Sequence, residues 1–192
     1  MMRFWWLRHG PTGVARAIGH TDVPATFPDT AALERLRAAL PAGAALVSSD
    51  LRRARQTAGR LGLDGPRLPD MPALRELDFG RWEDRSFAEI DLSEPEASRT
   101  FWTCPGPTPA PGGESWDDLC ARVGGAVSVL EAAAPAEDLV IVAHAGSIRA
   151  ALALALGLGA ERAFAFRIDP LSLTRIDRLG SAWAVDRVNV RP

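Results

Sequence analysis

Short apolar strands alternate with amphipathic helices along this chain, and that alternation limits its fold more than any other feature. Buried strands are expected at 3–7, 44–47 and 139–143, of which the last, Leu-Val-Ile-Val-Ala, is the strongest signal. Apolar stripes at helical spacing predict helices at 30–40, 51–61, 86–90, 116–130 and 148–156. Two further strands are expected at 163–168 and 182–188. The pattern predicts an α/β fold, a three-layer sandwich whose mostly parallel central sheet is flanked by helices.

One stretch is rich in proline and glycine, residues 104–113. Ten residues of this composition suit either a linker between domains or a surface loop. Because the alternation of strand and helix resumes after it, we expect a loop over a site. A chain of 192 residues is then a single domain, 1–192.

Composition excludes several classes of function. The chain contains no lysine, so it has neither a P-loop lysine nor a lysine for Schiff-base or kinase chemistry. The net charge of −2 predicts no nucleic-acid or membrane partner. Two cysteines and an opening apolar run that stops at Arg8 indicate a cytoplasmic protein without a signal peptide.

Two of the three histidines directly follow predicted strands. His9 lies in Arg8-His9-Gly10 after the first strand, and His144 follows 139–143. In α/β sheets, ligands bind beyond the carboxyl ends of the strands. A single histidine there is usually a hydrogen-bonded loop residue, but two at separate strand ends favour a site.

The residues around these histidines suit phosphoryl chemistry. The Arg8 guanidinium binds tetrahedral oxyanions, and a neutral imidazole at His9 can attack phosphorus. Three arginines, Arg52, Arg53 and Arg55, lie at a predicted helix start, where the helix dipole also favours anions, although a solvated helix face would explain them equally well alone. Glu76 lies in a loop among apolar neighbours and suits general acid work; an exposed loop carboxylate is the alternative.

Five sequence blocks occur together and in order: LRHGPT at 7–12, SDLRRARQTA at 49–58, LRELDFGRWE at 74–83, PGGES at 111–115 and VAHAG at 142–146. In these blocks the sequence resembles the histidine phosphatase superfamily, in its phosphoglycerate-mutase-like branch. The resemblance spans about three quarters of the chain and implies a phosphoglycerate-mutase-like fold.

The resemblance also implies a role for each matching residue. His9 would accept the phosphoryl group, and Arg8, Arg53 and His144 would line the phosphate pocket. Glu76 would protonate the leaving oxygen and then activate water. No cofactor or metal is implied, and the histidines lack the spacing of a zinc site.

Within the superfamily, the blocks are most similar to α-ribazole phosphatases and related small phosphomonoesterases. The implied partner is a small phosphorylated metabolite, with α-ribazole 5′-phosphate as one candidate, and a homodimer is compatible with the resemblance. We expect Thr21 and Ala145 to contact substrate and His20 to lie at the pocket rim or to be structural. Ala15 stands where mutases carry asparagine. A phosphoglycerate mutase and a non-catalytic phosphate-binding protein are the alternatives; no Gly-x-Ser-x-Gly motif supports a serine hydrolase.

Overall fold

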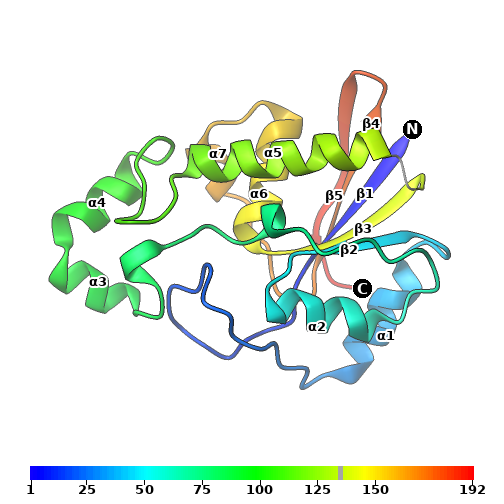
Figure 1. Ribbon diagram of the computed structural model, residues 1–192, viewed down its shortest axis with the longest axis horizontal. Helices are drawn as coiled ribbons and strands as arrows, with labels where there is room; N and C mark the ends of the chain where they lie inside the picture. The colour runs from blue at the N-terminus through cyan, green and yellow to red at the C-terminus, as the bar shows by residue number, and fades with distance from the viewer. Residues whose placement is uncertain (134–135) are drawn as a thin grey trace.

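The computed structural model describes residues 1–133 and 136–192, and a five-stranded sheet forms its centre (Figure 1). The strands lie in the order β2-β3-β1-β4-β5. Their bounds are Met2–Arg8 for β1, Ala45–Ser48 for β2, Asp138–Ala143 for β3, Leu173–Leu179 for β4 and Ala182–Val190 for β5.

The sheet is mixed, and the prediction of a mostly parallel sheet is wrong. Strands β1, β2 and β3 run parallel, whereas β4 pairs antiparallel with both β1 and β5. Helices connect the parallel strands, but β4 and β5 form a hairpin around Gly180, whose positive φ of 64° suits a tight turn. The antiparallel pairing of β4 with β5 follows from that short connection.

Helices cover both faces of the sheet (Figure 1). α1 (Thr30–Ala39) and α2 (Arg52–Leu61) pack on one face, and α5 (Trp116–Ala133) and α6 (Ala145–Leu156) pack on the other. Alternate residues of β1 serve the two cores: Trp5 and Leu7 join the α1/α2 core, and Phe4 and Trp6 the α5/α6 core. The predicted three-layer sandwich is confirmed.

Two short helices, α3 (Phe87–Ser93) and α4 (Pro95–Thr103), form an arm at the left of Figure 1. Trp82 and Phe101 pack edge to face at its base and are buried, whereas Phe87 and Trp102 are about half exposed. The predicted helix at 86–90 is confirmed, with a capping box between Ser86 and Glu89.

The expected strand at 163–168 is wrong, and β4 was not expected. Residues of the Ala-Glu-Arg-Ala-Phe run form the short helix α7 (Ala160–Phe164) because these are mostly good helix formers. β4 has the sequence Leu-Thr-Arg-Ile-Asp-Arg-Leu, whose charges hide the strand signal. Arg175 and Asp177 neutralise each other within it by two hydrogen bonds.

The proline-rich loop braces another loop and does not lie over a site. Its Pro111 carbonyl accepts from the Arg81 N–H, and the Asp78 carbonyl accepts from the Glu114 N–H. Gly80 and Gly113 allow this close approach, because a Cβ at Gly113 would lie 2.3 Å from the Asp78 carbonyl oxygen. The two loops therefore hold each other.

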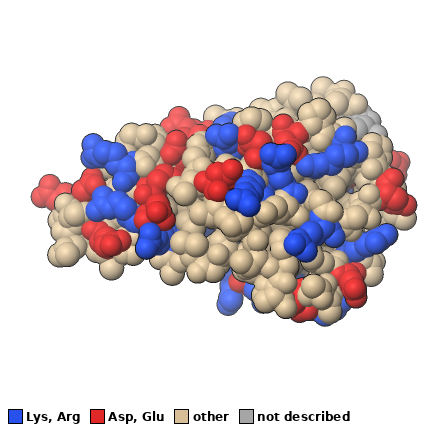
Figure 2. Space-filling model, turned by 60° about the horizontal axis from the view of Figure 1, so that its bottom comes forward, with Lys and Arg blue, Asp and Glu red and all other residues tan. Residues whose placement is uncertain are grey.

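The surface carries both signs of charge. On the face seen in Figure 2, arginines and acidic residues are interspersed and neither forms a continuous patch. None of the helices in residues 1–133 and 136–192 is long and apolar enough to span a membrane.

Candidate active site

The parallel pairing of β1 with β3 brings the two strand-end histidines together. Arg8 pairs with Ala143 at the ends of the strands, and the His9 N–H donates to the Ala143 carbonyl at 3.0 Å. The rings of His9 and His144 are 5.0 Å apart between centroids, and both residues are buried. The register of the sheet therefore builds the centre of the site.

His9 is held as a neutral imidazole with its Nε2 lone pair directed into the site. Its Nδ1 lies 2.7 Å from the Gly10 carbonyl and so carries the proton, while Nε2 accepts from Arg53 Nε at 3.2 Å. Burial lowers the pKa of His9 to about 3, and the charges of Arg53 and Arg8 act in the same direction. A neutral, buried imidazole of this kind is a competent nucleophile.

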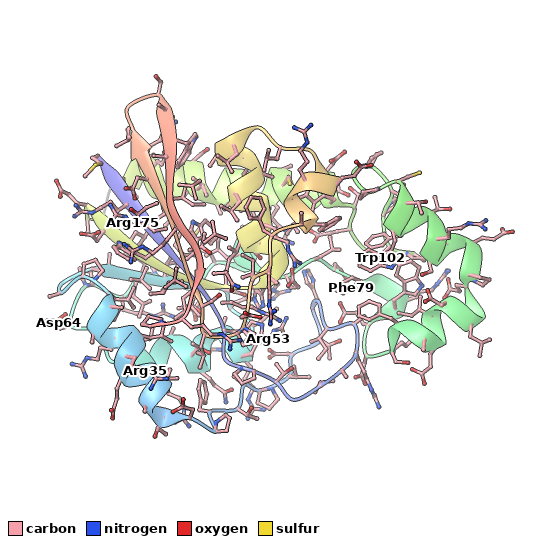
Figure 3. The ribbon with its side chains drawn as sticks, turned by 180° about the vertical axis from the view of Figure 1, so that it is seen from behind. Arg35, Arg53, Asp64, Phe79, Trp102 and Arg175 are labelled. Carbon is pink, nitrogen blue, oxygen red and sulfur yellow. The ribbon has the colours of Figure 1, made fainter. Side chains whose placement is uncertain are left out.

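Arg53 is the arginine of α2 that enters the site. It is 1% exposed and lies near the middle of the molecule (Figure 3), whereas Arg52 and Arg55 are exposed. Its Nη1 and Nη2 donate to the Thr21 and Gly19 carbonyls at 2.9 and 2.7 Å. Burial lowers the pKa of Arg53, but the guanidinium stays charged, and hydrogen bonds from its three nitrogens fix it in place.

Arg8 and His144 carry buried polar atoms without a partner in the described part of the chain. Arg8 Nη1 donates to the Ile168 carbonyl at 2.6 Å, but Arg8 Nε has no hydrogen bond. His144 Nε2 lies 2.9 Å from the Ser49 hydroxyl, but its Nδ1 has none. Buried polar atoms are usually hydrogen-bonded, and an oxyanion could accept hydrogen bonds from both Arg8 Nε and His144 Nδ1.

Glu76 faces this group from the loop between two 3-10 turns, η1 (Pro72–Leu74) and η2 (Gly80–Trp82). One carboxylate oxygen accepts from the Leu77 N–H at 3.0 Å, and the other accepts from the Gly146 N–H at 3.1 Å. The start of α6 thus fixes the direction of the carboxylate.

Arg8, His9, Arg53 and Glu76 line one cavity of about 160 Å³. Its outer wall comes from the loop after β1, from the loop that carries Glu76 and from the arm. The residues of this wall are Thr12, Val14, Arg16, Ala17, Ile18, Phe79 and Phe87. Phe79 and Phe87 pack edge to face, 6.5 Å apart between ring centroids. Larger cavities lie elsewhere but contain neither His9 nor Glu76.

The hydroxyl of Thr21, which was expected to contact substrate, is bound to another residue. Its hydroxyl donates to Glu83, and only its carbonyl acts in the site, as an acceptor for Arg53. Glu83 also accepts the N–H groups of Gly19, His20, Thr21 and Phe79, so it shapes the loop that holds Arg53. Burial opposes the charge of Glu83, but these hydrogen bonds outweigh it and hold its pKa below the ordinary value.

The other residues singled out in the sequence have varied places. Ala145 is the first residue of α6 and is buried beside His144, while Ala15 is exposed on the loop after β1. His20 lies 3.4 Å from Asp78, and Trp82 belongs to the core. In residues 1–133 and 136–192, no three His, Cys, Asp or Glu side chains cluster to hold a metal ion.

Arg149 lies one turn into α6 and belongs to none of the five sequence blocks. Its Nε donates to the Phe166 carbonyl at 2.8 Å, two residues from the carbonyl that Arg8 binds. Burial lowers its pKa, and the Glu76 charge opposes that shift. Its spacing of four from Ala145 places it on the face of α6 that meets the site, and that spacing was the available signal.

Known proteins resemble this chain over nearly its whole length. Residues 4–191 match the family described as the histidine phosphatase superfamily, branch 1. An adenosylcobalamin/α-ribazole phosphatase from Salmonella typhimurium is 31% identical over 186 residues, covering 92% of this chain and 90% of that protein.

Two solved structures extend the comparison. The α-ribazole phosphatase from Shigella flexneri superposes with a TM-score of 0.84 at 27% identity, covering 99% of this chain and 97% of that one. The mycobacterial glucosyl-3-phosphoglycerate phosphatase has a TM-score of 0.82 at 31% identity, and the match covers 100% of both chains.

Proposed function

Because this chain belongs to the histidine phosphatase superfamily and is a phosphoric monoester hydrolase of it, we propose that it hydrolyses a small phosphorylated metabolite through a phosphohistidine on His9. One observation carries the proposal: a neutral, buried His9 directs its Nε2 lone pair toward Arg53, beside buried nitrogens of Arg8 and His144 that have no partner among residues 1–133 and 136–192. A nucleophilic nitrogen surrounded by nitrogen donors suits the binding of a phosphoryl group.

In the first half-reaction, His9 Nε2 attacks phosphorus and the bond from phosphorus to the ester oxygen breaks. The phosphoryl oxygens take the N–H donors of Arg8 and Arg53 and the unpartnered nitrogen of His144, which would stabilise the charge on the transferring group. Protonated Glu76 gives its proton to the leaving oxygen. The products are the free alcohol and phosphohistidine.

In the second half-reaction, water enters where the alcohol left. Glu76, now a carboxylate, accepts a proton from this water while the water oxygen attacks phosphorus. The bond from phosphorus to His9 breaks, and inorganic phosphate leaves. Glu76 returns to its protonated state, so one carboxyl group serves both halves.

The residues of the outer wall favour a substrate whose leaving group is small and partly apolar. Phe79 and Phe87 offer aromatic surface, and Arg16 adds one charge at the rim. We propose α-ribazole 5′-phosphate as the first substrate to test, because its benzimidazole ring suits an aromatic wall and two relatives are named for it. Glucosyl-3-phosphoglycerate, in the name of another relative, is the natural competitor in the same assay.

The covalent step is tested by substituting His9. We expect His9→Ala to abolish turnover, and quenched wild-type reactions to contain an acid-labile, base-stable phosphoenzyme that the variant lacks. Exposed Arg52→Ala, on the same helix start as Arg53, serves as the control and should keep both activity and the phosphoenzyme. Turnover of His9→Ala at the wild-type rate would overturn the mechanism.

We further propose that residues 1–192 act as a single domain in the cytoplasm. The family match over 4–191 and the one central sheet support a single domain. Cys104 and Cys120 are both free thiols, as a reducing compartment would keep them. The homodimer remains a prediction, which sedimentation of the purified protein would test.

A further inference from the structure

The loop that carries Glu76 is partly buried and belongs to no strand or helix. Between η1 and η2, residues 75–79 have no regular secondary structure, and Leu74 and Leu77 are buried on either side of Glu76. Backbone carbonyls in such a segment need donors from elsewhere, because unpaired buried polar groups are destabilising. The donors that satisfy this loop come from two helices, α5 and α6.

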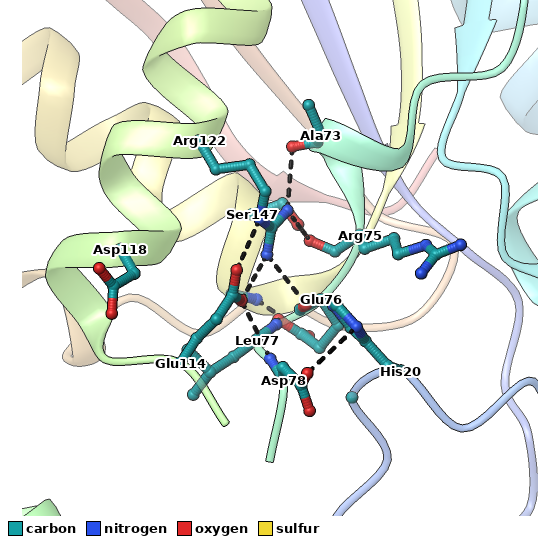
Figure 4. Close-up of polar contacts among 12 residues, drawn as sticks. His20, Ala73, Arg75, Glu76, Leu77, Asp78, Glu114, Asp118, Arg122 and Ser147 are labelled. Atoms are coloured by element: carbon teal, nitrogen blue, oxygen red, sulfur yellow. Dashed lines mark hydrogen bonds and ion pairs between the residues drawn. The ribbon is translucent and has the colours of Figure 1, made fainter. Parts of the chain in front are cut away.

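Arg122 of α5 supplies most of these donors (Figure 4). Its Nη1 donates to the carbonyls of Ala73 and Arg75, each at 3.0 Å, and its Nη2 donates to the Glu76 carbonyl at 3.2 Å. Nε and Nη2 also donate to the two carboxylate oxygens of Glu114, at 2.8 and 2.6 Å.

All five N–H groups of the guanidinium are thereby used. Arg122 has no donor left for a substrate, so its role is to bind the backbone of the Glu76 loop. Glu114 neutralises Arg122. Burial alone would raise the Glu114 pKa, but the hydrogen bonds from Arg122 and from the Asp78 N–H, together with the Arg122 charge, outweigh burial and lower it. Glu114 also accepts the Asp78 N–H at 3.1 Å. The Arg122–Glu114 ion pair therefore binds the loop before Glu76, at Arg75, and after it, at Asp78.

α6 holds the same loop from the other direction. The Ser147 hydroxyl lies 3.0 Å from the Leu74 carbonyl and 2.7 Å from the Arg75 carbonyl, and the Gly146 N–H binds the Glu76 carboxylate. The backbone of Glu76 is thus fixed by α5, and its carboxylate is fixed by α6.

We propose that Arg122, with Glu114, is a positioning residue that sets the Glu76 carboxyl group for proton transfer. The inference rests on the proposed function for its kinetic consequence, but the geometry that it asserts can be tested without activity. An arginine fork is required, since it satisfies three carbonyls and a carboxylate at once; a lysine ammonium has three donors and a different shape.

The kinetic test compares substrates that differ in their need for a general acid. In Arg122→Ala, we expect kcat to fall about tenfold or more for an alkyl phosphate, within the range that general acid catalysis contributes, and far less for 4-nitrophenyl phosphate. Ethylguanidinium replaces the atoms removed and should restore part of the loss, whereas ethylammonium at the same concentration should not. Arg122→Lys should resemble Arg122→Ala.

The control variant is Arg175→Ala. It removes a guanidinium of the same exposure, 20%, from its pair with Asp177 in β4, away from the Glu76 loop. It should leave the ratio of alkyl to aryl rates at the wild-type value. An unchanged ratio in Arg122→Ala, with or without a loss of stability, would overturn the positioning role.

A crystal structure of Arg122→Ala separates the two proposals. We expect the Glu76 carboxylate to leave the Gly146 N–H, which it accepts from at 3.1 Å in the wild type. If Glu76 stays in place, the positioning proposal fails whatever the activity. If Glu76 moves but the wild-type protein hydrolyses no phosphomonoester, the proposed function fails and the positioning role stands.

Discussion

The Glu76 carboxylate occupies the space beside Gly146 that a side chain would otherwise fill. The Gly146 N–H donates to one carboxylate oxygen at 3.1 Å, and a Cβ at Gly146 would lie 2.0 Å from the other. The glycine therefore allows the start of α6 to approach the carboxylate directly. A side chain at this position would displace Glu76 from its hydrogen bond.

We predict that Gly146→Ala lowers activity while leaving the fold intact. The atom that a new Cβ would meet is the end of a flexible side chain, so Glu76 can swing away at little cost in stability. Alanine also favours the helix by up to about 1 kcal/mol. Thermal unfolding should show a Tm near that of the wild type, while kcat for an alkyl phosphate falls. Gly125→Ala, on α5 with open space around its Cβ, is the matched control.

The strand-end histidines could be predicted from the sequence because parallel strands gather their carboxyl ends at one edge of a sheet. Arg53 could be singled out among the arginines of 52–55 only from the family resemblance, and its burial fits that choice. The arrangement around Glu76 could not be predicted. Arg122 and Gly146 reach Glu76 across 46 and 70 residues of sequence, and local patterns contain no record of such contacts.

The same limit explains the errors in the fold. The pairing of β4 and β5 is decided by the turn at Gly180, and the charged residues of β4 conceal its buried face. The hydroxyl of Thr21 binds Glu83, a partner 62 residues away, and its carbonyl accepts from Arg53, so the expected contact of Thr21 with substrate stays a prediction.

We predict that Glu76→Gln reduces kcat by roughly 10²–10⁴ for substrates with poor leaving groups. Glutamine keeps the shape of the side chain and cannot transfer a proton as the carboxyl group does. The loss should be smallest for aryl phosphates, whose leaving oxygen needs little protonation. Glu94→Gln, a substitution of a carboxylate in the arm, should change neither rate. Equal losses for alkyl and aryl phosphates would contradict the role of Glu76 as general acid.

Stability should fall as the pH drops from about 6.5 toward 3. The pKa of His9 lies near 3 in the folded protein against an ordinary value of 6.5, and burial lowers the pKa of His144 in the same direction. Between these values the unfolded chain binds a proton at His9 that the folded chain excludes, so lower pH favours unfolding by up to about 1.4 kcal/mol per pH unit for His9, and His144 acts in the same direction.

Urea unfolding between about pH 5 and pH 7 measures this dependence above the range where most carboxylates titrate. His9→Asn should show a shallower slope than the wild type, whatever its absolute stability. A variant slope as steep as that of the wild type would show that His9 is not held neutral by the fold.

Activity should survive removal of divalent metal ions by EDTA. The charge that would stabilise a transferring phosphoryl group comes from Arg8 and Arg53, which are fixed by the Ile168, Thr21 and Gly19 carbonyls. Steady-state rates before and after chelation should agree. A loss on chelation that a divalent ion reverses would show that the arginines do not suffice.

The last prediction concerns the fate of the phosphoryl group on His9. A mutase must keep water from its phosphohistidine until the product has reoriented, whereas a phosphatase must admit a water that a base can activate. Here the outer wall of the cavity is exposed to solvent, since Val14 is 38% and Phe87 is 45% exposed. Glu76 lines the same cavity and is the proposed base for water.

Little in the structure would close that wall. The proline-rich loop, residues 104–113, is held against Asp78 and Arg81 and contributes no residue to the lining of the cavity. Ala15, which replaces the asparagine expected of a mutase, is exposed. We therefore predict release of free phosphate from small phosphomonoesters, with isomerisation of 3-phosphoglycerate slower by orders of magnitude. A coupled assay for 2-phosphoglycerate, run beside a phosphate assay on the same sample, measures both rates. Isomerisation faster than phosphate release would assign the chain to the mutases.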